Sequence, residues 1–144
     1  MKDDQLFEAA DLILAVARHL NAAKEAHAES GTPLEGAVMR FVDRHPGTTV
    51  NAAAEATQMI SSNVSRAVRG LETKGLLRRE ADPADARRVR LYPTAKAAEN
   101  LQRLRDTWSA LLDGTFADTE EIGTLITALQ RIETRLVARS RGTA

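Results

Sequence analysis

The sequence lacks several features that would mark other classes of protein, and cysteine is the first of them. Without cysteine, disulfide bonds, thiolate metal sites and cysteine-based redox sensing are excluded. No stretch approaches the roughly 18 consecutive apolar residues of a membrane-spanning helix, and the acidic N-terminus lacks the basic region and apolar core of a signal peptide. The sequence therefore predicts a soluble, cytoplasmic protein without a membrane partner.

Aromatic side chains are also scarce, at 3% of residues against 43% for all hydrophobic residues. The core must therefore consist mainly of Ala, Leu, Val and Ile, and the abundance of Ala favours helices. A chain of 144 residues is long enough to bury a core and fits one compact unit, or a small domain with a helical extension. We expect a mostly α-helical protein.

The net charge is zero, but the charges are unevenly distributed. Residues 61–92 contain eight Lys or Arg and four Asp or Glu, whereas residues 1–60 contain five and nine, and residues 93–144 contain seven of each. A nucleic acid responds to local basicity rather than to the net charge of the whole chain. The segment 61–92 is therefore a candidate nucleic-acid-binding surface.

Helical spacing of apolar residues covers most of the chain outside this segment. The predicted helices run from Asp3 to about Glu29, from Pro33 to His45, from Thr94 to Asp113 and from about Asp118 or Thr119 to Ser140. The first and last of these helices carry broad apolar stripes, which need partners to cover them.

Two shorter helices precede the end of the basic segment. The first, 51–57, is rich in alanine, and residues 58–60 form the turn that follows. Ser61 is predicted to be the N-cap of the second helix, which ends at Lys74 and Gly75. Two short helices joined by about three residues match a helix-turn-helix.

A β-hairpin is predicted next, with antiparallel strands at 76–80 and 87–92 joined by an Asp-Pro turn. An isolated hairpin of this length is marginally stable, so it must pack on the helices. Residues 48–50 are either a very short strand or the lead into the following helix. The predicted fold class is mostly α with a small β-wing: a winged helix-turn-helix between N- and C-terminal helices.

The stretch LETKGLLRREADPADARRVRLYPTAKA resembles the signature of the multiple-antibiotic-resistance regulator (MarR) family. In that family an LExKGL-type run ends a helix, and the wing carries Asp-x-Arg followed by Leu-Thr. Asp85 and Arg87 match the Asp-x-Arg, and Thr94 matches the threonine. The family often has a basic residue, a leucine and two glycines at four positions where this chain has Ala86, Pro93, Ala97 and Gln58. Pro93 is expected to end the second strand early.

The resemblance implies a homodimer whose terminal helices interlock. Residues 1–32 and 94–144 would form the helical dimerisation region, and residues 33–93 the winged helix-turn-helix domain. Two such domains would straddle a palindromic operator in double-stranded DNA. Regulators of this family usually repress nearby genes and release DNA when a small molecule, often a phenolic or aromatic acid, enters the cleft beside the winged helix. The expected function is sequence-specific transcriptional regulation, as a repressor.

The helix that begins at Ser61 carries candidate DNA-binding residues. Ser61 and Ser62 can meet phosphates together with free backbone N–H groups at the helix start. Side chains further along the same face can reach base edges in the major groove, and these are Asn63, Ser65, Arg66 and Arg69. Which arginine contacts a base and which a phosphate stays open. The alternative is an amphipathic surface helix with solvated arginines.

In the wing, the resemblance implies that Asp85 orients an arginine so that the hairpin can enter or skirt the minor groove. Narrow A·T-rich minor grooves attract arginine. Arg87 and Arg88 are the candidates, and Arg87 is either the partner of Asp85 or the inserted side chain. The alternative is an ordinary solvated hairpin tip, where ion pairs contribute little.

The effector pocket of the family draws on the first, second and fifth helices. Its candidate residues in this chain are Arg18, His19, Met39, Arg40 and Trp108, although Trp108 also fits simple core packing. His19 and His27 are two helical turns apart, too far to bind one metal ion together. The sequence predicts neither a metal site nor a cofactor.

Two other classes of function are alternatives to a DNA-binding regulator. A winged helix can serve as a protein-interaction module without sequence-specific DNA binding, although such modules tend to lack arginines on both helix and wing. An enzyme is excluded, because the sequence has no Ser-His-Asp order, no paired carboxylates in an apolar setting and no Gly-rich phosphate loop.

Overall fold

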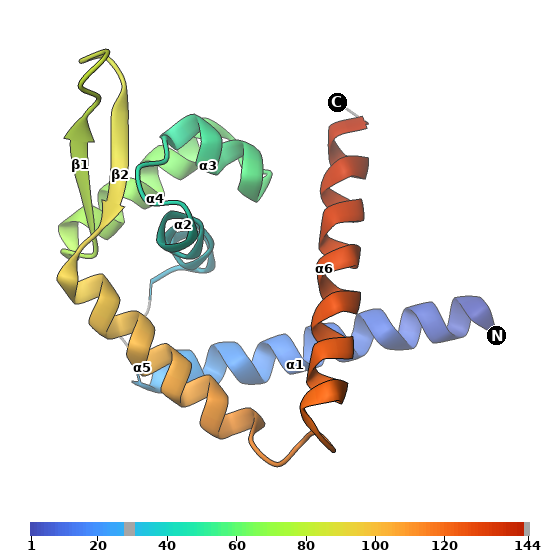
Figure 1. The fold of residues 1–144 in the computed structure, drawn as a ribbon. Helices are drawn as coiled ribbons and strands as arrows, with labels where there is room; N and C mark the ends of the chain where they lie inside the picture. The colour runs from blue at the N-terminus through green and yellow to red at the C-terminus, as the bar shows by residue number, and fades with distance from the viewer. Residues whose placement is uncertain (28–30, 143–144) are drawn as a thin grey trace. The chain divides into compact units, whose positions relative to one another are not determined.

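The computed structural model describes residues 1–27 and 31–142 (Figure 1). Within these residues it contains six α-helices and one two-stranded antiparallel sheet. The elements are α1 (Lys2–His27), α2 (Pro33–Arg44), α3 (Val50–Thr57), α4 (Ser61–Thr73), β1 (Leu77–Ala81), β2 (Val89–Pro93), α5 (Ala95–Leu112) and α6 (Thr119–Gly142). The predicted fold class is confirmed. The predicted end of the first helix near Glu29 lies outside the described residues.

The chain divides into two compact units. The first consists of Met1–Ser30 and Asn100–Thr115, and the second of Gly31–Glu99 and Phe116–Ala144. In the first unit the indole N–H of Trp108 donates a hydrogen bond to the carbonyl oxygen of Leu20 at 2.9 Å. This half-buried indole therefore joins α1 to the second half of α5.

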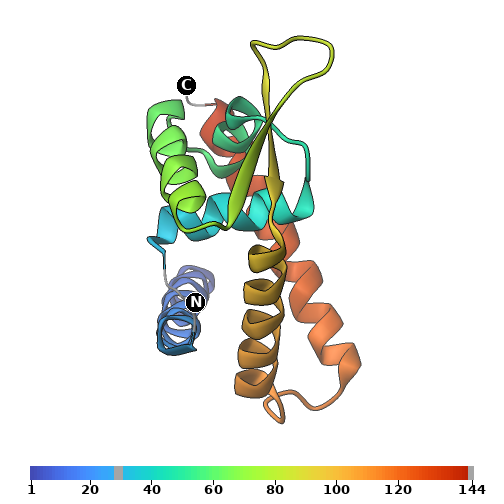
Figure 2. The ribbon, with the colours of Figure 1, turned by 90° about the vertical axis from the view of Figure 1, so that its left-hand side faces the viewer.

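The core of the second unit lies between α2, α3, α4 and the hairpin. α2 packs against α3, α4 and β2, and α4 also packs against β1. Figure 2 shows the hairpin standing beside these helices, with the loop between β1 and β2 extending beyond them. The buried side chains are aliphatic, as the composition predicts: Val38, Val42, Ala53, Ala54, Val64, Ala67, Val68, Leu71, Leu76, Leu77, Leu91 and Ala97.

Small and branched aliphatic residues allow the helix-turn-helix to pack closely. Ala53 and Ala54 are buried on α3, where small side chains let the neighbouring helices approach. On α4 the buried positions recur at spacings of three and four, from Val64 to Leu71, so one face enters the core. The opposite face is left to solvent.

The turn between these helices begins at Gln58, which has a φ of 57°, in the left-handed region. Its side-chain amide donates a hydrogen bond to the carbonyl oxygen of Glu55 at 2.7 Å. That bond offsets part of the cost of a conformation that glycine adopts more readily. The turn is therefore kept although glutamine replaces glycine.

The hairpin pairs residues from Leu77 opposite Pro93 to Ala81 opposite Val89. β1 begins one residue later than predicted, at Leu77. β2 begins two residues later than predicted, at Val89, because Arg87 and Arg88 belong to the loop. The expectation that Pro93 ends β2 early is wrong, because Pro93 is its last paired residue. The edge of a two-stranded sheet tolerates a residue without an N–H group.

The residues before α3 fit both alternatives raised by the sequence. Thr48 forms an isolated bridge with Leu91 of β2, whose N–H donates to the Thr48 carbonyl oxygen at 2.7 Å. Val50 already belongs to α3, with Thr49 as its N-cap. The bridge gives the hairpin a third point of attachment beside its contacts with α2 and α4.

Candidate nucleic-acid interface

The solvent-facing side of α4 carries the residues predicted to contact DNA. Ser61, Ser62, Arg66 and Arg69 are exposed, and Asn63 and Ser65 are half-buried. They lie opposite the buried face of the helix, so the packing that holds α4 also presents these polar groups together.

The N-terminus of α4 differs from the prediction. The N-cap is Ile60 rather than Ser61, and no side chain accepts a hydrogen bond there. Ser61 is the first helical residue, because the turn ends one position earlier than the sequence pattern indicates. The N–H groups of Ser61 and Ser62 therefore have no capping side chain and, with the positive end of the helix dipole, can bind an external anion, whereas the Asn63 N–H donates to the Ile60 carbonyl oxygen at 3.0 Å. Ile60 is itself 65% exposed.

The C-terminus of α4 is held at three points. The Lys74 ammonium pairs with the Glu35 carboxylate of α2 at 2.6 Å. The Thr94 hydroxyl donates to the Gly75 carbonyl oxygen at 2.6 Å, and the Lys96 ammonium donates to the Lys74 carbonyl oxygen at 2.8 Å. The Thr94 hydroxyl also accepts a hydrogen bond from the Ala97 N–H at 3.2 Å and so caps the start of α5. These bonds fix α4 against the starts of α2 and α5.

Asp85 shapes the tip of the wing. Its carboxylate accepts a hydrogen bond from the Arg87 backbone N–H at 3.0 Å, and its carbonyl oxygen accepts from the Arg88 N–H at 2.9 Å. These bonds explain why both arginines belong to the loop rather than to β2. The Arg87 guanidinium lies 3.7 Å from the same carboxylate. The Arg87 side chain remains 96% exposed, so this ion pair is weak.

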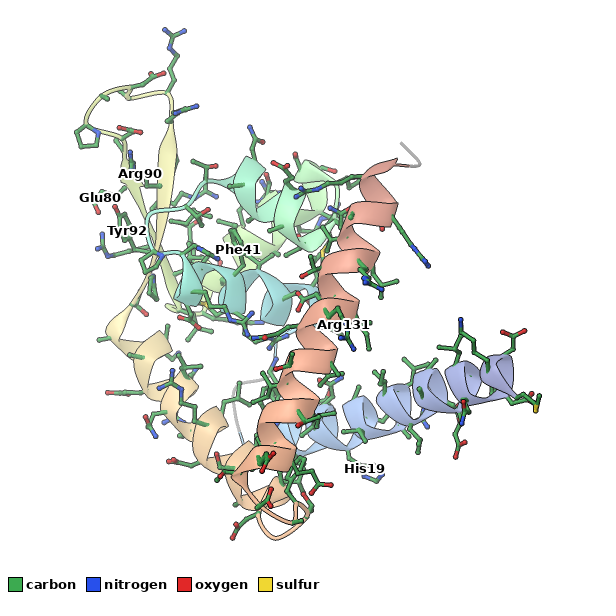
Figure 3. All side chains as sticks on the ribbon, turned by 45° about the vertical axis from the view of Figure 1, so that its right-hand side comes forward. His19, Phe41, Glu80, Arg90, Tyr92 and Arg131 are labelled. Atoms are coloured by element: carbon green, nitrogen blue, oxygen red, sulfur yellow. The ribbon has the colours of Figure 1, made fainter. Side chains whose placement is uncertain are left out.

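Asp82 forms a second acidic centre at the base of the wing loop. Its carboxylate accepts from the Ala84 N–H at 2.9 Å and from the Arg90 Nε at 3.2 Å. The Ala84 hydrogen bond and the nearby Arg90 and Arg88 guanidinium groups hold the pKa of Asp82 below its usual value. Arg90 and Glu80 project from the hairpin in Figure 3.

Ion pairing divides the cations of the basic segment into two groups. Each of the four acids in the segment pairs with a cation of the same segment, in the pairs Glu72–Arg79, Glu80–Arg78, Asp82–Arg90 and Asp85–Arg87. Arg78 also lies over the Tyr92 ring, 4.5 Å from its centroid. Within the described chain, no ion pair engages Arg66, Arg69 or Arg88. The uncompensated positive charge of the segment is therefore concentrated on the exposed face of α4 and the wing.

The candidate effector residues lie on three helices. Arg18 and His19 are exposed on α1, and His19 projects away from it in Figure 3. In the second unit, Met39 packs against the aliphatic core, and Arg40 is half-buried. Burial lowers the pKa of the Arg40 guanidinium, and the positive charge of Arg44 lowers it further. Trp108 has the packing contact with α1 given above.

Residues 1–27 and 31–142 contain neither a metal-binding group of side chains nor a membrane-spanning helix. Within them, no three His, Asp or Glu side chains are grouped so that they could hold a metal ion. None of the helices in this part of the chain is both long enough and apolar enough to cross a membrane.

Several residues that shape the interface were not identified from the sequence. Asp82 was visible only as the start of an Asp-Pro turn, and its partner Arg90 only as one of several basic residues. Glu35 and Lys96 gave no signal, because their contacts with Lys74 depend on how α2 and α5 pack.

Two short helices joined by a tight turn, followed by a hairpin with an arginine-bearing loop, define a winged-helix protein. The model of the MarR family matches residues 32–88. The transcriptional regulator HosA of Escherichia coli O111:H- is 32% identical over 103 residues, which cover 72% of this chain and 72% of that protein. A relative from Thauera aromatica, named for regulation of an hcr operon, is also 32% identical, but the match spans only 64% of its length.

Solved structures share this fold. The transcriptional regulator SlyA superposes with a TM-score of 0.71 at 21% identity, over 94% of this chain and 99% of that chain. A variant of MepR from S. aureus, bound to an oligodeoxyribonucleotide, superposes with a TM-score of 0.65 at 21% identity, over 92% and 96%. The chain belongs to the MarR family. It is a transcriptional regulator of MarR type, and the prediction that it is not an enzyme agrees with this family.

Proposed function

We propose that this regulator binds a specific double-stranded DNA operator through α4 and the wing. The observation that carries the proposal is the division of charge: Arg66, Arg69 and Arg88 have no ion pair in the described chain, whereas the neighbouring acids are all engaged. Unpaired cations on a preformed surface can neutralise phosphates and contact base edges without first breaking internal bonds. The oligodeoxyribonucleotide bound to the MepR variant supports the same use of the fold.

The polar face of α4 suits the major groove, which admits a helix and offers a distinct pattern of donors and acceptors at each base pair. Arg66 and Arg69 are the candidates for guanine or phosphate contacts, and Asn63 and Ser65 for further base-edge contacts. At the helix start, Ser61, Ser62 and the uncapped N–H groups suit a phosphate. In the wing, Arg87 and Arg88 suit the adjacent minor groove, with Asp85 orienting the loop.

Selection of DNA by the purified protein tests this function. Fragments bound from a random-sequence pool should converge on one palindromic sequence, and affinity for it should fall steeply as salt rises, because counterions are released. The double variant Arg66→Glu/Arg69→Glu should lose this binding and keep its circular dichroism spectrum. Pools that do not converge would contradict the proposal.

The same experiment addresses the alternative of a protein-interaction module without sequence-specific DNA binding. Such a module would retain DNA no better from the selected pool than from scrambled sequences of equal length. The arginines of helix and wing favour the DNA-binding function over this alternative. Operator binding also implies that the protein works in the cytoplasm.

The proposed assembly is a homodimer. Residues 1–32 and 94–144 would form the dimerisation region, and residues 33–93 the DNA-binding domain. The support is the exposed apolar surface of the terminal helices: Leu6, Phe7, Leu12, Ile13, Leu14 and Val16 on α1, and Ile122, Leu125, Ile126, Leu129, Ile132 and Leu136 on α6. A two-fold dimer would set two recognition helices about 34 Å apart, one DNA turn.

Repression with release by a small aromatic or phenolic acid is the regulatory mode we propose. A structural neighbour, PcaV of Streptomyces coelicolor, is known in complex with its natural ligand. The residues proposed for effector binding are Arg18, His19, Met39, Arg40 and Trp108. Benzoate, salicylate and hydroxybenzoates should each be titrated into the operator complex. An effector should release the DNA and raise the melting temperature of the free protein, whereas release without such stabilisation would argue against binding to the protein.

A further inference from the structure

Asp82 stands out as the only buried charged side chain in the described part of the chain, with 7% of its surface exposed. It follows directly after β1, where the wing loop begins. A charged group is buried at a cost unless hydrogen bonds and an opposite charge compensate it. The surroundings of Asp82 supply both, so the residue is held in one arrangement.

The contacts of Asp82 close the loop on two sides. One carboxylate oxygen accepts from the Ala84 N–H at 2.9 Å, and the other accepts from the Nε of Arg90 at 3.2 Å and lies 3.2 Å from its Nη2. The Asp82 backbone N–H donates to the Arg88 carbonyl oxygen at 2.9 Å. The residue therefore binds the start of the loop to both the end of the loop and β2.

Among the loop residues, Arg88 is the one whose backbone these hydrogen bonds hold most directly. Its carbonyl oxygen is held by Asp82, and its N–H donates to the Asp85 carbonyl oxygen at 2.9 Å. Its side chain is exposed and has no ion pair in the described chain. The backbone of Arg88 is thus fixed from both sides while its guanidinium stays available. The Arg88 guanidinium is near enough to Asp82 to lower the pKa of its carboxyl, but only Arg87 lies within ion-pair distance of an acid, 3.7 Å from Asp85.

We propose that Asp82, bound to Arg90, is the positioning residue that directs Arg88 into the minor groove beside the recognition helix. This role rests on the proposed operator binding. Residues 83–88 are all exposed, so the loop is ordered by hydrogen bonds alone: those of Asp85 shape its tip, and those of Asp82 fix its base to β2. A fixed loop presents an arginine without the entropy cost of ordering it on binding.

The test compares wild type, Asp82→Asn, Arg88→Ala and the double variant on the operator selected by the wild-type protein, with affinity measured by fluorescence anisotropy. Asp82→Asn should weaken binding about tenfold, and Arg88→Ala by a similar factor. In the Arg88→Ala background, Asp82→Asn should change affinity less than about twofold, because the residue it positions is gone. Equal effects of Asp82→Asn in both backgrounds would overturn the role.

A second measurement tests whether Arg88 contacts the minor groove. Replacing the flanking adenines by 2,6-diaminopurine adds an amino group in the minor groove and leaves the major-groove edge unchanged. Wild type should lose affinity on this DNA, whereas Asp82→Asn should bind both operators about equally. A variant as sensitive as wild type would contradict the proposal.

The control is Glu80→Gln on the same hairpin, whose ion pair with Arg78 at 2.7 Å is exposed on both partners. It should bind like wild type in both assays. If Asp82→Asn does not fold, Arg90→Gln removes the other partner of the ion pair. Arg90→Gln should then weaken binding in the wild-type background but not in the Arg88→Ala background. Equal effects of Arg90→Gln in both backgrounds would overturn the role of Asp82. A wild-type protein that selects no sequence would instead refute operator binding itself, and this role with it.

Discussion

Ion pairing separates the cations that hold the winged helix together from those left available to DNA. Arg79 on β1 pairs with Glu72 of α4, so it joins the recognition helix to the wing. Arg66 and Arg69 stand on the exposed face of the same helix without an ion pair in the described chain. Side chains of one type in one short segment therefore have different expected roles.

Single alanine substitutions should reveal this difference. Arg66→Ala and Arg69→Ala should each weaken operator binding by about 1–3 kcal/mol and leave the free energy of unfolding nearly unchanged. A base contact would also relax preference at one operator position, whereas a phosphate contact would weaken all sequences alike. Anisotropy titrations on single-base operator variants make the measurement.

The matched control is Arg79→Ala, which should have the opposite profile. It breaks the contact with Glu72, so it should lower stability more than operator affinity. Equal losses of operator affinity for Arg66→Ala and Arg79→Ala would show that ion pairing does not separate the DNA-binding arginines from the stabilising ones.

The free energy of unfolding should depend on pH, because the pKa of the Asp82 carboxyl is lowered in the folded protein. Because the folded protein binds the proton less tightly than the unfolded chain, the contribution is complete above the ordinary Asp pKa of about 3.9 and is lost as pH falls through the lower folded value. Asp82→Asn removes this contribution. Urea denaturation should therefore show wild type more stable than the variant at pH 6, with the gap narrowing below about pH 4. A gap independent of pH would contradict the assignment.

At the scale of elements, the start of α5 is hydrogen-bonded to the end of α4. The Thr94 hydroxyl bonds to the Gly75 carbonyl oxygen and caps α5 through the Ala97 N–H, and Lys96 bonds to the Lys74 carbonyl oxygen. The first residues of α5 therefore help to hold the recognition helix in place.

Thr94→Val keeps the shape of the side chain but removes both hydrogen bonds. It should cost about 0.5–2 kcal/mol of stability, as the loss of a helix cap does, and should also weaken operator binding because α4 is less firmly held. Thr73→Val is the control: its hydroxyl bonds only within α4, to the Arg69 carbonyl oxygen. Urea denaturation and anisotropy measure the two effects. Similar stability losses in both variants would argue against a special role for Thr94.

Local signals predicted the elements well. Pro33, His45 and Gly75 mark helix boundaries through backbone constraints that act within a few residues, so the sequence alone suffices. The side of α4 that carries Ser62, Arg66 and Arg69 is exposed, as its polar residues indicate. These features locate the helix-turn-helix and its exposed face.

Contacts between elements could not be predicted in this way. The pairing of Asp82 with Arg90 depends on the register of the hairpin, which the predicted strand ranges do not define. The Glu35–Lys74 pair depends on the packing of α2 against α4. The prediction that Ser61 is the N-cap was wrong for a different reason, because a serine at the first helical position gives the same local signal as a serine at the N-cap.

At the scale of the whole molecule, the terminal helices expose more apolar surface than a monomer needs. Phe7 on α1 is 74% exposed and Leu136 on α6 is 55% exposed. Large exposed apolar patches mark protein interfaces. The proposed homodimer gives these patches a partner.

An aspartate on α6 should disrupt that dimer. Leu129→Asp should convert the protein to monomers in light scattering, because it places a charge in an apolar interface. Operator affinity should fall as well, since one recognition helix would bind without the other. Thr127→Asp, exposed on the same helix but outside the apolar stripe, is the control and should stay dimeric. A monomeric wild type would refute the assembly outright.

The left-handed conformation of Gln58 has a consequence for engineering. A residue other than glycine pays about 1–2 kcal/mol in this region, and the side-chain bond to Glu55 returns only part of that. Gln58→Gly should therefore raise the melting temperature in calorimetry, and a lower one would show that the bond more than compensates. One substitution would then give a more heat-resistant regulator for use in a biosensor, with every group proposed to contact DNA left in place.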